Sequence, residues 1–288
     1  HSDETGLLPS GDRLPWSELR QELEQTRADV RIAILDSCAS GTLIRGKGGT
    51  KRSPLLLDEG PQVKGHAYLT SSSADEAAQE SDRIGASYFT HHLVTGLRGA
   101  ADVNSDRRVT LSEAYQYAFH QTLKRTEKTR KGPQHPNYDF ELAGSRDVVI
   151  TALHNMASTM IFNKALAGRV FIRDTRGRLV AELSKLPGRR IELGLSPGTY
   201  RVNLHVDDRI FTTETTLVRG RRVPVRSETL IPVRQREVSQ TRDSLPVNEE
   251  GVVRDPPPAQ LGRPAARFNI HLVPGLGLLG VASGTHIT

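Results

Sequence analysis

The sequence has one cysteine, few aromatic residues and no long apolar run. A single cysteine, Cys38, excludes a disulfide bond within the chain. No stretch of about 18 apolar residues occurs, so the sequence predicts no transmembrane helix. With 288 residues and a hydrophobic fraction of 36%, the chain is long enough for one full domain and part of another.

Positive charge is concentrated in the second half of the chain. Residues 1–150 hold 19 Lys and Arg against 21 Asp and Glu, whereas residues 151–288 hold 20 against 12. The basic half is poor in aromatic residues and has no motif for a DNA groove or for base stacking, so nucleic acid is not the expected partner. A solvated basic surface is the simpler interpretation, and an anionic surface remains open as a partner.

The chain is organised around the segment that ends in Cys38. Residues 30–35 are short, apolar and rich in β-branched side chains, which is typical of a strand buried in a parallel sheet. Catalytic groups in such sheets gather beyond the carboxyl ends of the strands, and Cys38 follows this strand in the sequence Asp36-Ser37-Cys38-Ala39-Ser40-Gly41. A catalytic cysteine is therefore predicted. The alternative is a buried structural cysteine.

This setting resembles the caspase-like cysteine peptidases, and within them the bacterial and metacaspase branch. There an apolar strand runs into Asp-Ser-Cys-His-Ser-Gly, and the cysteine is the nucleophile; here Ala39 replaces the histidine of that motif. The family's base is a histidine in a Ser-Gly-His turn, and residues 1–9 look like the continuation of that turn. The resemblance therefore implies a Cys38–His1 dyad, with the backbone N–H groups of Cys38 and Ser2 holding the oxyanion. It implies no cofactor for catalysis.

The resemblance also predicts the substrate class, a protein or peptide cleaved after Arg or Lys. In metacaspase-like enzymes an aspartate two residues before the nucleophile helps to form an acidic pocket, and Asp36 matches it. The alternative is that Asp36 only caps the turn. Residues 66–73 predict a strand with a polar end, and Ser71 and Ser72 at that end are the further candidates for substrate contact.

Residues 102–113 have the layout of a calcium-binding EF-hand loop. Oxygen-bearing side chains occur at positions 1, 3, 5, 9 and 12, and the ligands would be Asp102, Asn104, Asp106, the backbone carbonyl of Arg108, Thr110 and Glu113. One departure is Arg107, which stands where such loops have glycine for a sharp turn. The alternative is a polar loop between helices that binds no metal.

The fold class expected is α/β, with a caspase-like, mostly parallel sheet flanked by helices and followed by a small antiparallel β-sandwich. The peptidase unit would span residues 1–152, with its first strands missing from the chain, and its helices would include 82–99 and 112–127. The sandwich would span 165–226, a Pro-rich linker 227–265, and a further β domain would start at 266–288. A second functional class, a catalytically inactive caspase-like scaffold, remains open, as does the compartment, cytoplasm or cell envelope.

Overall fold

The chain, described from a computed structural model, has a mixed α/β fold with few helices and many strands in several sheets. The structure describes residues 2–3, 5–8, 12–37, 40–44, 63–74, 76–81, 84–144, 147–233 and 277–280. Within these ranges, no helix is both long enough and apolar enough to cross a lipid bilayer.

Among the described residues of the first half of the chain there are three α-helices. They are α1 (Trp16–Gln25), α2 (Tyr88–Thr95), which continues into the π-helical turn η2 (Gly96–Ala100), and α3 (Leu111–Thr126). The strands up to residue 152 are β1 (Gly6–Leu7), β2 (Leu14–Pro15), β3 (Val30–Leu35), β4 (Lys64–Thr70), β5 (Glu80–Ser81), β6 (Ala86–Ser87), β7 (Arg108–Thr110), β8 (Asn137–Ala143) and β9 (Val149–Ala152). The later strands are β10 (Ser158–Phe162), β11 (Gly168–Arg173), β12 (Leu179–Lys185), β13 (Ile191–Leu195), β14 (Gly198–Val206), β15 (Arg209–Leu217), β16 (Arg222–Val225), β17 (Ile231–Val233) and β18 (Gly277–Gly280).

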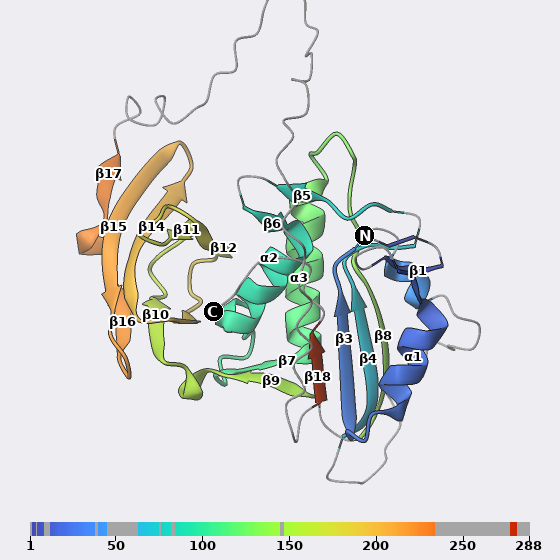
Figure 1. The fold of residues 1–288 in the computed structure, drawn as a ribbon. Coiled ribbons are helices and arrows are strands. Elements are labelled where there is room, and N and C mark those ends of the chain that lie inside the picture. Colours follow the sequence, from blue (N-terminus) through green and yellow to red (C-terminus); the bar gives the residue numbers. More distant parts are fainter. Residues whose placement is uncertain are drawn as a thin grey trace, which may run out of the picture.

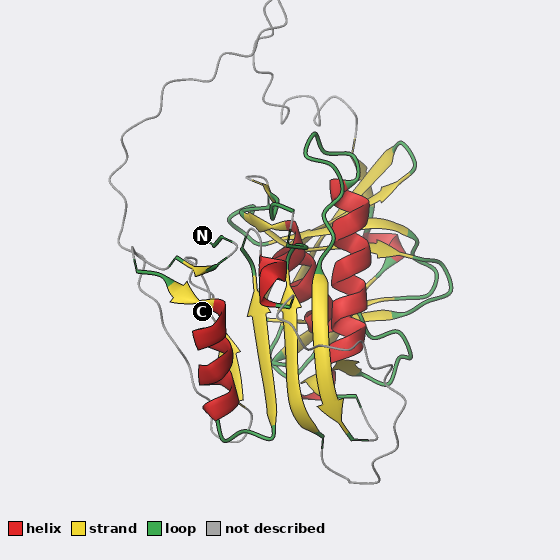
Figure 2. Ribbon diagram, turned by 90° about the vertical axis from the view of Figure 1, so that its right-hand side faces the viewer, coloured by secondary structure: helices red, strands yellow, loops and turns green. Residues whose placement is uncertain are grey.

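The parallel pair β3 and β4 forms the centre of the first sheet, with Leu35 opposite Thr70 at its end. β18 lies parallel to β3, and β8 pairs antiparallel with β4, which gives the order β18-β3-β4-β8. α1 covers one face of this sheet, and α2 and α3 cover the other (Figure 1). Figure 2 shows β3 and β4 ending at one edge of the sheet while β8 runs the opposite way. The residues that follow β3 and β4 therefore meet at that edge.

Alternating side chains on β3 and β4 bury both faces of the sheet, as the period of two requires. The face toward α1 contributes Ala33, Leu35 and Tyr68, which cluster with Trp16, Leu19 and Leu23. The opposite face contributes Ile32, Ala67 and Leu69, which cluster with residues of α2 and α3 that include Phe89 and Leu93. Each fully buried Leu, Ile or Phe side chain of these clusters stabilises the fold by about 1.5–3 kcal/mol.

Each helix begins where the local sequence favours it. Pro15 precedes α1, at a position where a backbone N–H would have no partner within the helix. Proline, which lacks the N–H, therefore loses no hydrogen bond there. Ser87 caps α2, because its hydroxyl accepts the Thr90 N–H at 3.0 Å. Thr110 and Glu113 form a reciprocal capping box at the start of α3.

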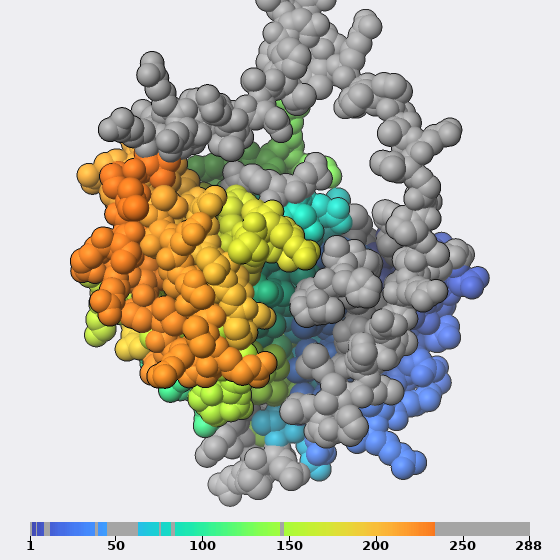
Figure 3. All heavy atoms as spheres, turned by 60° about the vertical axis from the view of Figure 1, so that its left-hand side comes forward, coloured from blue at the N-terminus to red at the C-terminus, as the bar shows by residue number. Residues whose placement is uncertain are grey.

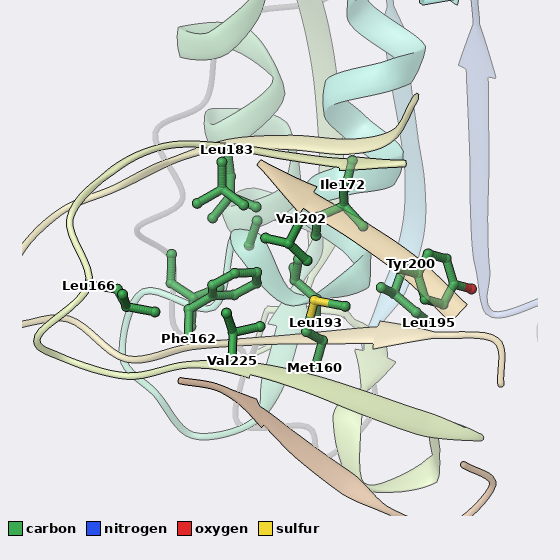
Figure 4. Packing of buried hydrophobic residues seen from close by; sticks show 14 of the residues in the cluster. Met160, Phe162, Leu166, Ile172, Leu183, Leu193, Leu195, Tyr200, Val202 and Val225 are labelled. Carbon is green, nitrogen blue, oxygen red and sulfur yellow. The ribbon is translucent and has the colours of Figure 1, made fainter. Parts of the chain in front are cut away.

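The second half of the chain forms two sheets that pack face to face. A five-stranded antiparallel sheet has the order β12-β11-β14-β15-β17, and a three-stranded sheet has the order β13-β10-β16. Their inner faces meet in one apolar cluster, in which Phe162, Leu193, Val225 and Val202 point toward one another (Figure 4). This is the β-sandwich that the spacing of short strands predicts, and it begins earlier than expected, with β10.

The sandwich packs against α2, α3 and η2. Glu182 of β12 is 3% exposed; its carboxylate accepts a hydrogen bond from Arg169 Nε at 2.7 Å and lies 3.5 Å from Arg125 Nη2 of α3. Gly99 has a φ of 124° and approaches β13 so closely that a Cβ there would lie 2.1 Å from the Glu192 carbonyl oxygen. In Figure 3 the sandwich strands, yellow to orange, form one lobe beside the rest of the described chain.

Several boundaries differ from the sequence predictions. The second helix begins at Tyr88 and not at residue 82. The strand β8 was not predicted, although Tyr138, Phe140 and Leu142 alternate along it. The loop before β8 lies at the carboxyl end of β4, where Gln134 Nε2 donates a hydrogen bond of 2.6 Å to the Ser71 carbonyl. The chain therefore enters β8 at that end and runs antiparallel to β4.

Two later strands also take partners that the sequence did not predict. The predicted strand at 147–151 is β9, and it pairs with β7 in a separate two-stranded sheet. The Asp147 carboxylate accepts the Ser112 N–H at 3.3 Å, so the chain enters β9 beside the start of α3. In the sandwich, β10 and β16 are parallel, whereas the sequence predicted an antiparallel sandwich. The Gly220 N–H donates to the Ala157 carbonyl at 2.7 Å, so β16 enters at the same end as β10.

The tail of the chain only partly overlaps the described residues. The predicted linker at 227–265 begins with a 3-10 turn, Ser227–Thr229, which is followed by β17. This strand pairs with β15 as the edge strand of the sandwich, and the residues from 234 lie outside the described residues. Within 266–288, the four residues of β18 join the first sheet beside β3. A further β domain in this range stays a prediction.

Candidate functional site

The described residues that flank Cys38 in the sequence are bonded to each other. Asp36 and Ser37 follow β3, and the Ser37 carbonyl accepts the Ser40 N–H at 3.3 Å. Cys38 and the predicted base His1 themselves lie outside the described residues. Ser40–Leu43 forms a short 3-10 helix, and the Leu43 carbonyl accepts a hydrogen bond from Arg20 of α1. The described residues before and after Cys38 in the sequence are thus connected to each other and to α1.

Asp36 is anchored to the first turn of α2. Its Oδ2 accepts a hydrogen bond of 2.5 Å from the Thr90 hydroxyl and a second one from the Ser87 hydroxyl. Bonds from hydroxyl donors to a carboxylate are stronger than bonds between neutral groups. The two bonds fix the orientation of the carboxylate two positions before Cys38. Sequence reasoning named neither Ser87 nor Thr90 as part of this site.

The two serines predicted to contact substrate lie at the end of β4. The Ser71 N–H donates to the Leu35 carbonyl at 2.9 Å, and the Ser71 hydroxyl donates to the Ser37 carbonyl at 3.4 Å. The structure therefore brings Ser71 to the segment that leads into Cys38. Both Ser71 and Ser72 are fully buried. Their contact with a substrate stays a prediction.

A buried glutamine braces the loop that contains these serines. Gln134 is fully buried; its side chain accepts the Gln79 N–H at 2.9 Å and donates to the Ser71 carbonyl at 2.6 Å. Nearby, the Glu76 carboxylate accepts the His135 N–H at 2.7 Å and lies 2.7 Å from His135 Nδ1. Because these bonds connect residues more than 50 positions apart, the sequence alone gave no signal for them.

The segment that contains Ser2 is folded back onto the start of α1. Ser2 forms an isolated antiparallel bridge with Leu7, and the Trp16 indole N–H donates to the Asp3 carbonyl at 3.2 Å. The Asp3 side chain accepts hydrogen bonds from the Thr5 hydroxyl and N–H, and these bonds hold the pKa of Asp3 below its ordinary value. Figure 1 places β1 at the edge of the sheet where β3 and β4 end, the edge at which Ser71 lies.

The predicted calcium loop joins η2 to α3. Asn104 Oδ1 accepts the Asp106 N–H at 2.8 Å, and Asp106 Oδ1 accepts the Arg108 N–H at 2.8 Å. Thr110 donates its N–H to Glu113 Oε2 at 3.0 Å. Nowhere in the described ranges do three His, Cys, Asp or Glu side chains converge in a group ready to hold a metal ion.

His91 and His92 lie on α2, which packs against β12 of the sandwich, and are not part of the Cys38 turn. Burial lowers the pKa of His91 to about 4 and that of His92 to about 3. His92 is 1% exposed, and neither of its ring nitrogens has a hydrogen-bond partner in the described chain. Both rings are therefore neutral near pH 7 and act as core side chains.

Comparisons with protein-family models, with curated proteins and with solved structures give no match. The function proposed below therefore rests on the residues and contacts of this chain.

Proposed function

We propose that the chain is a caspase-like cysteine endopeptidase that uses a Cys38–His1 dyad and cleaves after Arg or Lys. One observation carries the proposal: the segment Asp36–Ser37 follows a strand that is parallel to its neighbour and leads directly into the single cysteine. This is the position at which open α/β sheets gather their catalytic groups. The first sheet, with helices on both faces, would then be the caspase-like sheet.

In the proposed reaction, the Cys38 thiolate attacks the scissile carbonyl carbon and forms a tetrahedral intermediate. The C–N bond breaks, the leaving amine takes a proton from His1, and a thioester remains on Cys38. Water gives a proton to His1 and attacks the thioester, which releases the carboxylic acid and restores the thiol. The N–H groups of Cys38 and Ser2 would stabilise the oxyanion.

The contacts of Asp36 support the preference for a basic side chain before the cleaved bond. The Thr90 and Ser87 hydroxyls both donate to Oδ2, so the carboxylate is held in one orientation beside the cysteine turn. A fixed negative charge at that place would favour Arg or Lys in the substrate over Asp.

A caspase-like binding scaffold is the second candidate, and the burial of Ser71 and Ser72 favours it. These two side chains, at the end of β4, present no surface to a substrate in this arrangement. A scaffold would use the sheet and the sandwich for binding and would need neither Cys38 nor His1.

Hydrolysis of fluorogenic peptides that end in Arg, Lys or Asp distinguishes the two candidates. We expect cleavage of the Arg and Lys peptides by the protein and none by its Cys38→Ala variant. The Cys38→Ser variant keeps a side chain of similar size and should also be inactive, which shows that the loss of the thiol and not a packing change removes the activity. Asp36→Asn is expected to raise KM for the basic peptides more than it lowers kcat. A folded protein that cleaves none of the three peptides would support the scaffold, and cleavage after Asp alone would contradict the acidic pocket.

A further inference from the structure

The loop of residues 102–113 brings its first and last carboxylates together. Asp102 Oδ2 accepts the Arg107 N–H at 3.1 Å, so the Asp102 side chain points across the loop. Glu113 Oε1 accepts the N–H of Val103, the residue after Asp102, at 3.3 Å. Asp102 and Glu113, the first and last residues of the loop, thus lie close to each other although they are eleven positions apart.

The loop also makes the sharp turn that the sequence placed in doubt. Arg107 stands at the sixth position, where a calcium loop has glycine, and it adopts a φ of 66°. Its guanidinium lies 3.6 Å from Glu192 of the sandwich, so its charge is paired outside the loop. The left-handed backbone is therefore reached without the glycine.

One oxygen of the Asp102 carboxylate has no hydrogen-bond partner among the described residues. Asp102 is 8% exposed, and its Oδ1 atom is buried without a hydrogen-bond donor in the described part of the chain. The carboxylates of Asp106 and Glu113 are close enough to act electrostatically on Asp102. A buried carboxylate oxygen without a donor, close to two other carboxylates, is an unfavourable arrangement that a cation would relieve.

We propose that this loop binds one Ca²⁺ ion, with Asp102 Oδ1 as its buried ligand. Asn104, Asp106, the Arg108 carbonyl, Thr110 and Glu113 would complete an oxygen shell of the kind that Ca²⁺ prefers. The carboxylates are not assembled in the arrangement described, because Glu113 is engaged in the capping box of α3. Binding therefore requires Glu113 to exchange its contacts with Thr110 for the ion.

The loop is bonded to the sandwich, so the ion would act at the junction of the two halves of the chain. Arg189 Nη2 donates to the Asp102 carbonyl at 2.6 Å, and Arg107 is paired with Glu192. An ion bound only by the folded loop stabilises the folded protein by mass action. We therefore expect Ca²⁺ to raise the Tm of the whole protein.

Isothermal titration calorimetry of the metal-free protein with Ca²⁺ alone measures binding directly and tests this proposal without any peptidase assay. We expect one ion per chain, bound with a Kd between about 10⁻⁶ and 10⁻³ M, and weaker binding of Mg²⁺. Asp102→Asn and Glu113→Gln should each weaken binding at least about tenfold, because each removes a charged ligand. Asp208→Asn, an exposed acidic residue of the β14–β15 turn, is the matched control and should bind as the unmodified protein does.

The variants are chosen so that a failure to fold cannot imitate a loss of binding. Gln at position 113 can still cap the helix, and Asn at position 102 is isosteric with Asp. The Tm of each variant without Ca²⁺, together with its far-UV circular dichroism, reports whether it has folded. Absence of binding up to about 10 mM Ca²⁺, well above the weakest known loop sites, or equal binding by Asp102→Asn and the unmodified protein would overturn the proposal.

Discussion

The Thr90 hydroxyl lies 2.5 Å from Oδ2 of Asp36 and donates a hydrogen bond to it, although 54 positions separate the two residues. This bond joins the turn before Cys38 to the first turn of α2. Asp36 is therefore more than a local cap of its own turn, which was one of the two interpretations of the sequence. The Ser87 hydroxyl donates to the same oxygen, so two residues from one helix start hold the carboxylate.

The Thr90→Val variant tests the strength of this connection. The substitution removes the hydroxyl and keeps the shape, so Asp36 loses one donor, and we expect the free energy of unfolding to fall by about 1–3 kcal/mol. Urea unfolding measures the change. If Asp36 also binds a basic substrate side chain, KM for Arg peptides should rise in the same variant.

Thr122→Val is the matched control for this variant. Thr122 is also helical and is fully buried, whereas Thr90 is partly buried, and the Thr122 hydroxyl has no partner within the described ranges. Because the substitution removes an unsatisfied polar group, we expect stability to stay the same or to rise. Equal losses in the two variants would show that Thr90 contributes packing and no specific bond.

His91 and His92 make stability depend on pH between about 7 and 4. Their pKa values are lowered to about 4 and about 3 by burial, so the unfolded chain takes up protons first as the pH falls. Their contribution is fully present above about pH 6.5 and is lost as the pH falls toward the folded-state values. Glu182, Arg98 and Arg125 also act on His91, and His91, Arg125 and Arg169 act on His92; burial remains the main cause of both shifts.

The His92→Leu variant isolates one of these two contributions. Between pH 7 and pH 5 the unmodified protein should lose about 2 kcal/mol more unfolding free energy than the variant, since the variant has one proton fewer to take up. Urea unfolding at the two pH values measures this difference. Parallel pH profiles would contradict it, and His120→Leu provides a histidine control at a position outside the buried pair.

Arg107 allows backbone strain to be separated from its ion pair. Arg107→Ala removes the pair with Glu192 and keeps a side chain in the left-handed region, whereas Arg107→Gly removes the pair and the strain together. We expect the glycine variant to be more stable than the alanine variant by about 1–2 kcal/mol, as measured by thermal or urea unfolding. Equal stability would mean that the loop changes its conformation in both variants.

The sequence determined the local structure around the predicted site. The apolar run at residues 30–35 is β3 with the predicted boundaries, and the short alternating strands after residue 165 belong to a sandwich. The helices α2 and α3 were predicted, but from residues 82 and 112, whereas their capping residues are Ser87 and Thr110. These features depend on side-chain periodicity and on hydrogen bonds within a few residues, both of which can be read along the chain.

Only the tertiary structure decided which distant groups meet. The anchoring of Asp36 by Thr90, the bracing of Ser71 by Gln134 and the pairing of β10 with β16 join segments that are about 50 or more positions apart. A buried polar group needs a partner wherever the packed chain supplies one, and no local pattern states which residue that is. The same holds for Asp102, whose place in an acidic loop is plain from the sequence, whereas its buried oxygen without a donor is known only from the fold.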